Sequence, residues 1–299
     1  MFAILISSID SAENSRKDHT MNSATARPLK LDEIGDWSVL KLEILRQYSY
    51  AYSTILTKHR LHHSYIDGFA GAGQHILKRT KELMPGSPWN ALNLEPPFRE
   101  LHLIDLDRSR TAELRRLSYG LPNVTIHDGD ANEILLKIFP KVKYEQYRRA
   151  LCILDPYGLH LDWKVIEAAG KMGTIEIFLN FPVHDMNRNV LWWNPDLPDP
   201  DDVARMNTFW GDESWRTAAY SGEGNLFKEL EKQPNEVIVG AFRDRLKTVA
   251  GFKCVPEPVA MKNSTGAVVY YLFFAAQEPT AEKIARDIFR RTTIRSING

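Results

Sequence analysis

The sequence lacks the features that would place it in several specialised protein classes. It has two cysteines in 299 residues, too few for a disulfide scaffold or for a metal site made of cysteines alone. Its apolar start, residues 2–6, is far too short to span a bilayer and has neither the basic flank nor the cleavage site of a signal peptide. We therefore expect a cytoplasmic protein with no membrane association.

The sequence also has no excess of positive or negative charge. Lysine and arginine together number 38, and so do aspartate and glutamate. Without a global basic field, any nucleic acid must be held by local basic patches. The candidates are Lys78, Arg79 and Lys81, then Arg148 and Arg149, then Arg243, Arg245 and Lys247, and finally Arg290, Arg291 and Arg295. The alternative for each run is a solvated surface.

The predicted fold begins after a polar N-terminal segment. The composition of residues 7–27 predicts disorder, so we treat residues 1–27 as a disordered tail. Met21 could itself be the start codon, which would leave residues 1–20 untranslated or as a loose tail. His59, His62 and His63 invite a metal interpretation, but no fourth ligand lies near them in sequence, and polar loop residues are the favoured alternative.

A glycine-rich turn organises the chain. A short apolar strand at residues 65–66 runs into Asp67 and then Gly68, Gly71 and Gly73. The acid can accept hydrogen bonds from a polar ligand tail, and the glycines leave room for a sugar and adenosine. This arrangement is expected at the first strand-to-helix crossing of a doubly wound sheet. The spacing G-x-x-G-x-G is not the dinucleotide fingerprint, and a turn without a ligand is the alternative.

Acidic residues follow the next two predicted strands. Residues 100–106 form the second strand, and Asp105 at its end is placed to bind both hydroxyls of a ribose. Asp107 is expected to cap a helix over residues 109–117. After the third strand, residues 124–127, Asp130 can accept from an exocyclic adenine amine, and either Asp130 or Asn132 caps the helix that ends at residue 138.

The fourth and fifth strands carry the remaining motifs. The fully apolar residues 150–154 are typical of a buried parallel strand, within which Cys152 is expected to be a core thiol. This strand ends in the sequence Asp-Pro-Tyr-Gly, residues 155–158. The fifth strand, residues 174–179, is followed by Asn180 and, in the sequence Asn-Arg, by Arg188; both are candidate substrate contacts, with ordinary turn and salt-bridge roles as the alternative.

The other segments support this α/β pattern. Helices are predicted over residues 37–52 with Asp36 as N-cap, over residues from Pro88 with Ser87 as N-cap, and over residues 163–169, 235–249 and 281–291. Residues 74–85 are a lid candidate or a disordered insertion. Residues 190–225 form a partly helical insertion over the mouth of the sheet, whose tryptophans either stack a base or, preferably, form a satellite core. Residues 252–255 and 268–276 are expected to pair antiparallel.

The four strand-end motifs, taken together, resemble those of class I methyltransferases, which bind S-adenosylmethionine. The resemblance implies a Rossmann-like, mostly parallel doubly wound sheet with a C-terminal helical and β elaboration. It implies that S-adenosylmethionine is held by residues that follow the first three strands: Asp67, Gly68, Phe69, Gly71 and Gly73 near the methionine part, Asp105 at the ribose, and Asp130 with Ala131 at the adenine. The corresponding division is a cofactor-binding core over residues 28–189, a Trp-rich insertion over the sheet edge at residues 190–250, and terminal elements completing the core at residues 251–299.

The fourth motif concerns the methyl acceptor. Methyltransferases that act on exocyclic amines of bases carry Asp/Asn-Pro-Pro-Tyr/Phe at this place. Asp155 and the carbonyl of Pro156 could accept the two amine hydrogens, and Tyr157 could stack on the base; such positioning can supply much of the rate. This sequence has one proline, so its tyrosine stands one position early. The alternative is that Asp155 and Pro156 only shape a tight turn.

A closer resemblance extends from about residue 37 onward. It rests on residues 65–73 (YIDGFAGAG), 86–88 (GSP), 129–132 (GDAN), 154–158 (LDPYG), 180–182 (NFP) with 187–188 (NR), 209–211 (FWG) and 270–272 (YYL). These motifs resemble the three-Cys-motif partner protein (TcmP) family. That resemblance implies a partner with three cysteines, similar to radical S-adenosylmethionine or iron–sulfur proteins.

The leading hypothesis is an S-adenosylmethionine-dependent methyltransferase acting on a nitrogen of a nucleic-acid base, without a metal. One alternative is a non-catalytic or cofactor-binding partner subunit of a three-cysteine protein. Another is a different DNA-processing enzyme on the same scaffold, for which the sequence offers no paired-carboxylate metal motif.

Overall fold

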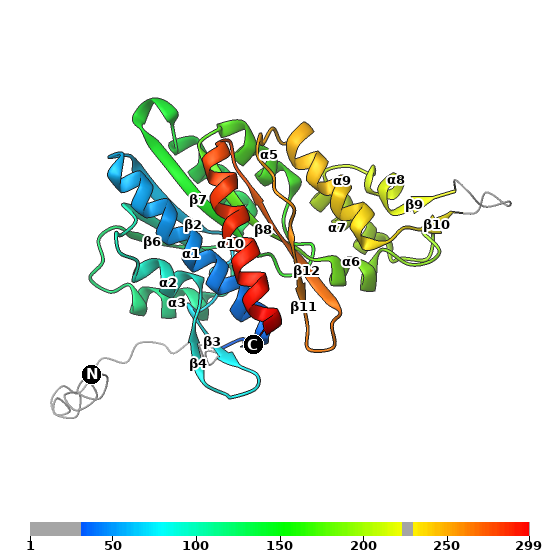
Figure 1. Ribbon diagram of the computed structural model, residues 1–299, viewed down its shortest axis with the longest axis horizontal. Coiled ribbons are helices and arrows are strands. Elements are labelled where there is room, and N and C mark those ends of the chain that lie inside the picture. Colours follow the sequence, from blue (N-terminus) through cyan, green and yellow to red (C-terminus); the bar gives the residue numbers. More distant parts are fainter. Residues whose placement is uncertain (1–30, 223–229, 299) are drawn as a thin grey trace, which may run out of the picture.

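A seven-stranded sheet forms the centre of the protein (Figure 1). The computed structural model describes residues 31–222 and 230–298; the tail predicted for residues 1–27, and with it the question of Met21, lies outside these residues. The strands lie in the order β11-β12-β8-β7-β2-β5-β6. Their bounds are β2 (His62–Asp67), β5 (Glu100–Asp105), β6 (Val124–Asp128), β7 (Arg148–Leu154), β8 (Ile175–Phe181), β11 (Val259–Lys262) and β12 (Val268–Ala275).

The first five of these strands along the chain are parallel. From β2 the chain moves outward through β5 to β6, then returns to the other side of β2 and continues through β7 to β8. The order of crossing therefore reverses between β2 and β7, and ligands bind at such a switch point in doubly wound sheets. Strand β12 is antiparallel to β8, and β11 is antiparallel to β12. The fold is Rossmann-like α/β, as the sequence predicts.

Alternating side chains of each central strand enter two different cores. In β7, Leu151 and Ile153 pack on one face, while Cys152 and Leu154 pack on the other. The first face is covered by α1 (Asp36–Lys58), α2 (Ser87–Leu92), α3 (Arg108–Leu117) and α10 (Pro279–Asn298). The second is covered by α4 (Ala131–Ile138), α5 (Trp163–Met172), α6 (Val183–Asn189), α7 (Pro200–Trp210), α8 (Trp215–Ala219) and α9 (Asn235–Thr248). Short 3-10 turns at Phe139–Lys141 and Tyr144–Gln146 precede β7.

Residues 74–85 fold as a hairpin and are not a disordered insertion. They form β3 (Gln74–Leu77) and β4 (Leu83–Pro85), an antiparallel hairpin. Strand β1 (Glu33–Ile34) pairs parallel with β3 and completes a small three-stranded sheet. The hairpin turn contains Lys81 at φ 61°, a left-handed conformation that the sequence does not announce with glycine or asparagine.

The Trp-rich segment joins the main core and does not form a satellite. Trp210 and Trp215 are fully buried in the same cluster as Phe181 and Phe242. Trp193, by contrast, is 76% exposed and does not belong to this core. A short two-stranded sheet, β9 (Tyr220–Ser221) with β10 (Glu231–Lys232), closes this region. The partner of β12 is β11 and not residues 252–255, from which Cys254 makes a single bridge to Ala276.

Three local predictions are corrected. Gly35 and Gly86 occupy the N-cap positions of α1 and α2, so Asp36 and Ser87 are the first helical residues and not the caps. His62 and His63 belong to β2 and not to a loop.

Among the helices of the described residues, none has the length and apolar character needed to cross a membrane.

Candidate functional site

A cavity of about 880 Å³ opens at the edge of the sheet where β2, β5, β7 and β8 end. Its size is within the range of ligand-binding clefts, about 300–1,000 Å³. Ten of the thirteen candidate site residues predicted from the sequence line it: Gly68, Phe69, Gly71, Asp105, Asp130, Ala131, Asp155, Pro156, Tyr157 and Asn180. Segments far apart in sequence thus meet at one edge. Asp67, Gly73 and Arg188 do not line it.

Backbone hydrogen bonds fix the glycine turn, residues 67–73, to the strands beside it. The Gly68 N–H donates to the carbonyl of Ile153 at 3.0 Å, and the Ala70 N–H donates to that of Ile104 at 2.9 Å. Gly71 has φ 63°, and a Cβ added there would meet no atom within 4 Å. The cavity wall at Gly71 is therefore bare backbone, which glycine allows at no steric cost.

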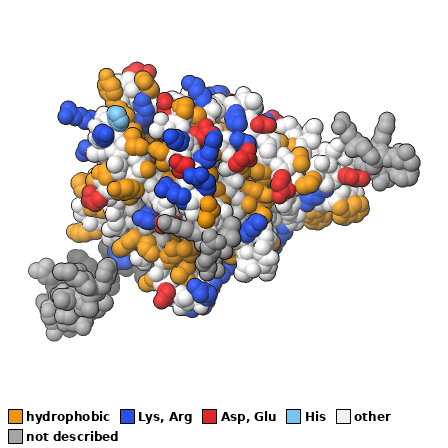
Figure 2. Space-filling model, in the orientation of Figure 1, with side chains coloured by type: hydrophobic (Ala, Val, Ile, Leu, Met, Phe, Trp, Pro, Cys, Tyr) orange, Lys and Arg blue, Asp and Glu red, His pale blue; other side chains and the backbone are white. Residues whose placement is uncertain are grey.

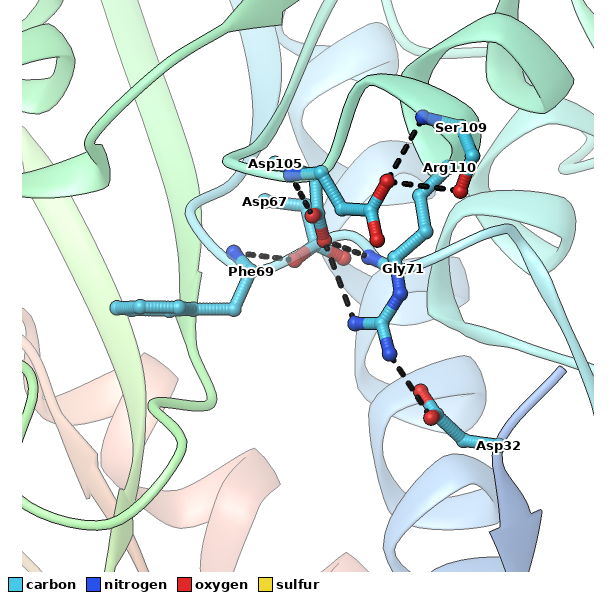
Figure 3. Close-up of polar contacts among 8 residues, drawn as sticks. Asp32, Asp67, Phe69, Gly71, Asp105, Ser109 and Arg110 are labelled. Carbon is cyan, nitrogen blue, oxygen red and sulfur yellow. Dashed lines mark hydrogen bonds and ion pairs between the residues drawn. The ribbon is translucent and has the colours of Figure 1, made fainter. Parts of the chain in front are cut away.

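Asp105 is the centre of a polar network at the end of β5 (Figure 3). One carboxylate oxygen accepts from the Gly71 N–H and the other from the Asp107 N–H, each at 2.8 Å. Arg110 lies 3.8 Å from the first oxygen and also pairs with Asp32 at 2.8 Å. A carboxylate has about four acceptor sites, so Asp105 keeps capacity for ligand hydroxyls. Asp107 caps α3 through the Ser109 N–H, as expected.

Asp130 and Asn132 shape the wall that follows β6. Asp130 is the N-cap of α4 and accepts from the Asn132 N–H at 2.8 Å, which settles the alternative between these two residues. The Asn132 side chain accepts from the Asp162 N–H and donates to the His160 carbonyl. This amide therefore ties α4 to the loop that follows β7.

Asp155, directly after β7, is held from two sides. The Asn180 amide donates to one carboxylate oxygen at 2.8 Å, and the Lys41 ammonium forms an ion pair with the other. The Asn180 Oδ1 atom is buried and has no hydrogen-bond partner among the described residues. A buried acceptor without a partner is costly, so this oxygen marks a place where a ligand donor would be favourable.

Lys41 comes from α1, which lies against the cavity. Burial alone would lower the pKa of Lys41, but the nearby Asp155 carboxylate outweighs it, with Tyr270 and Asp67 in support, so this pKa is raised. Its ammonium also lies over the Tyr270 ring, 5.6 Å from the centroid. Burial raises the pKa of Tyr270 to about 12. An ammonium and a carboxylate in direct contact, each held by further neighbours, thus form part of the cavity wall.

The Asp67 carboxylate is buried and makes hydrogen bonds within the protein. Its side chain is 1% exposed and accepts from the Ser87 hydroxyl at 2.8 Å, from the Tyr65 hydroxyl and from the Phe69 N–H, both at 3.2 Å. Burial raises the pKa of Asp67 to about 6. The carboxylate therefore joins the glycine turn to the start of α2, and the expected contact to a methionine tail has no exposed oxygen to make it.

Tyr157 stands at the rim of the cavity. Its side chain is 89% exposed and lies nearly parallel to the His160 ring, 6.5 Å between centroids and 21° between planes. Pro156 beside it is buried. Residues 190–225, expected over the mouth, contribute no side chain to the lining among those described.

Several lining residues were missed by sequence analysis, among them Lys41, His75 and Tyr270. Lys41 had a usable signal, because it is in helical register with the buried Leu45, Tyr48 and Tyr52. His75 lies on β3, in the segment read as a loop. Tyr270 reaches the site only because β12 inserts beside β8, which no local pattern reports.

Several side chains of the basic runs are paired with acidic neighbours. Ion pairs join Lys81 to Glu33, Arg148 to Glu100, Arg243 to Glu257 and Arg245 to Asp212. On the face shown in Figure 2, blue and red side chains are interspersed. Within the described residues, no three His, Cys, Asp or Glu side chains gather in a way that could hold a metal ion.

Comparison with known proteins gives distant structural likenesses. No family model matches the sequence, and no curated protein matches it. Similar solved structures include a DUF519 family protein from Legionella pneumophila, with TM-score 0.49, 14% identity, and coverage of 83% of this chain and 89% of that one. They also include a Thermobifida fusca protein provisionally named a methyltransferase (TM-score 0.38, 12% identity, coverage 80% and 82%). A third is the N-methyltransferase NodS from Bradyrhizobium japonicum (TM-score 0.32, 12% identity, coverage 77% and 97%). At this distance they identify no reaction, and the resemblance to the TcmP family stays a prediction.

Proposed function

We propose that the protein is an S-adenosylmethionine-dependent methyltransferase whose cofactor and acceptor meet in this cavity. The observation that carries the proposal is the convergence of the glycine turn, Asp105, Asp130 and Asp155 on one space of about 880 Å³. Each of these groups follows a different strand, so the convergence is a property of the fold and not of one local motif.

The cavity walls suit the cofactor. The bare backbone at Gly71 admits a sugar, and the remaining acceptor capacity of Asp105 suits ribose hydroxyls. Asp130 is exposed at the start of α4, where it can accept from an adenine amine, while the Ala131 N–H is at the first turn of that helix. When bound, S-adenosylmethionine supplies an electrophilic methyl group on a positively charged sulfur.

Asp155 is suited to orient a nitrogen acceptor. Asn180 and Lys41 hold its carboxylate in one orientation, the first through a hydrogen bond and the second through an ion pair. A fixed carboxylate accepts an N–H of the acceptor and directs the nitrogen lone pair toward the methyl donor. The Pro156 carbonyl or the unpartnered Asn180 oxygen can accept the second hydrogen.

We extend the proposal to an exocyclic amine of a nucleic-acid base as acceptor. Tyr157 supports this choice, since its exposed ring beside His160 gives a planar group a surface on which to stack. Lys78 and Arg79, exposed on the turn between β3 and β4, are basic side chains on the sheet that also carries His75. They are available for phosphate contacts.

The test is transfer of a labelled methyl group from S-adenosylmethionine to DNA, RNA or protein extract by the full chain. The expected result is labelled nucleic acid, with loss of at least about 100-fold in rate for Asp155→Asn. Asp128→Asn, which alters an aspartate paired with Arg115 outside the cavity lining, is the matched control. Labelling that is equal in wild type and Asp155→Asn would overturn the assignment of Asp155.

The same assay distinguishes the second hypothesis. If the cofactor binds but no extract is labelled until a three-cysteine protein is added, the chain is a cofactor-binding partner subunit. Labelled protein with unlabelled nucleic acid would keep the methyltransferase and overturn the base as acceptor.

A further inference from the structure

A second cavity lies at the opposite edge of the sheet. It has a volume of about 370 Å³ and includes Arg149 and Glu176, near the starts of β7 and β8, whereas the first cavity includes residues at the ends of these strands. Its walls come from α1 and from the first turns of α10, which pack against each other (Figure 1). The volume is sufficient for a small organic ligand.

Two polar groups in this cavity are unusual for their surroundings. Glu176 lies between two buried isoleucines of β8, Ile175 and Ile177, and its carboxylate accepts from the Tyr48 hydroxyl at 2.5 Å. Tyr52 is 6% exposed, and its hydroxyl has no hydrogen-bond partner among the described residues. Burying a carboxyl group and an unsatisfied hydroxyl side by side costs stability, which a ligand donor would recover.

The charge of the cavity favours a cation. Glu278, which precedes α10, adds a second carboxylate near Glu176. Two basic side chains, His59 and Arg149, also line the cavity. The Arg149 guanidinium lies over the Tyr144 ring, 4.3 Å from the centroid, and donates to the Arg148 carbonyl. Burial raises the pKa of Glu176 to about 7, which means that burial disfavours its ionised form. A bound cation would stabilise that ionised form.

The remaining walls are apolar. Ile55, Leu56 and Ile284 line the space beside the two tyrosines. An ammonium group would find the Glu176 carboxylate and the Tyr52 oxygen as acceptors, while an aromatic or aliphatic body would lie against these side chains.

We propose that this cavity is a separate binding site for a small primary amine with an apolar body, held by Glu176 and Tyr52. It does not share lining residues with the cavity at the carboxyl edge. The proposal can therefore be tested independently of methyl transfer. Helix α1 contributes to both cavities, with Lys41 in the first and Tyr48 in the second.

The test is calorimetric titration of the full chain at pH 7.5 with 2-phenylethylamine and, separately, with uncharged 2-phenylethanol. We expect one saturable site that prefers the amine by at least about tenfold, and a loss of about tenfold or more in Glu176→Gln. Tyr52→Phe keeps the ring and removes the hydroxyl, so it is expected to weaken amine binding by about threefold to tenfold while leaving the fold intact.

Glu257→Gln, which changes a carboxylate paired with Arg243 away from this cavity, is the matched control and should bind the amine as wild type does. Titration of each variant with S-adenosylmethionine is a second control, since binding in the first cavity should not change. Absence of saturable amine binding, equal binding of amine and alcohol, or an equal loss in Glu257→Gln would overturn the proposal.

Discussion

At the scale of single residues, the candidate active site depends on a few side chains whose partners lie far away in sequence. Asp155 shows this most clearly, because it is fixed by Lys41 from α1 and by Asn180 from β8. Sequence analysis identified Asp155 and Asn180 from their positions at strand ends. It missed Lys41, although its helical register with three buried apolar residues was visible.

Lys41→Met is expected to reduce methyl transfer by about 10- to 100-fold, because it frees Asp155 to leave its productive orientation. As a positioning residue, Lys41 should act through Asp155, so the double variant with Asp155→Asn should be little worse than Asp155→Asn alone. The measurement is kcat and KM for the three variants. Losses that multiply in the double variant would show that Lys41 acts independently.

Gly71→Leu is expected to weaken cofactor binding, because the added side chain would enter the cavity. Gly120→Leu is a matched control: Gly120 also has positive φ with no atom within 4 Å of an added Cβ, but it lies outside the cavity. Both variants should lose about 1–3 kcal/mol of stability through backbone strain. Calorimetry should find at least a tenfold loss of S-adenosylmethionine affinity in the first alone; an equal loss in both would contradict the assigned cavity wall.

Glu176→Gln is expected to change the pH dependence of stability. The ordinary pKa of this carboxyl is 4.5 and its native pKa is about 7, so the native protein retains a proton that the unfolded chain releases. Stability from this group is therefore complete below about pH 4.5 and is lost as pH rises toward 7. Relative to the variant, wild type should lose up to about 3 kcal/mol across this range, measured by urea unfolding. A difference that is constant with pH would contradict the raised pKa.

At the scale of elements, sequence patterns predicted long and apolar segments well and short ones poorly. The strands of the parallel sheet and helices α3, α5 and α9 were found, because their apolar periodicity is strong. Strands β1 and β3 were missed, since two to four residues carry little periodicity and their pairing is set by tertiary contacts. The predicted partner of β12 was wrong because the alternation of side chains along a strand does not show which strand lies beside it.

Helix α9 provides the element-scale prediction. Phe242 is fully buried, with ring centroids of Phe181, Phe209, Trp163 and Trp210 all within 6 Å. Phe242→Ala should destabilise the protein by about 3–5 kcal/mol through a cavity at this junction. Thermal unfolding should remain a single transition shifted to lower temperature, because the same core includes the central strands. Two separated transitions would instead show that the Trp-rich segment unfolds independently.

At the scale of the whole molecule, the sheet topology brings together what the sequence presents as separate motifs. Reversal of strand order between β2 and β7 puts the glycine turn, Asp105 and Asp155 around one cavity. This convergence was predictable, because parallel strands present their carboxyl ends at one edge. The direction of individual side chains was not predictable: Asp67 is the last residue of β2 and begins the glycine turn, yet its carboxylate is buried under that turn.

The most direct test of the central claim is calorimetric titration of S-adenosylmethionine into the full chain and two aspartate variants. We predict a single site in wild type, at least about 100-fold weaker binding in Asp105→Ala through lost charge-assisted hydrogen bonds, and unchanged binding in Asp107→Asn, whose side chain caps α3 outside the cavity lining. Absence of binding by folded wild type, or equal affinity in wild type and Asp105→Ala, would contradict the account.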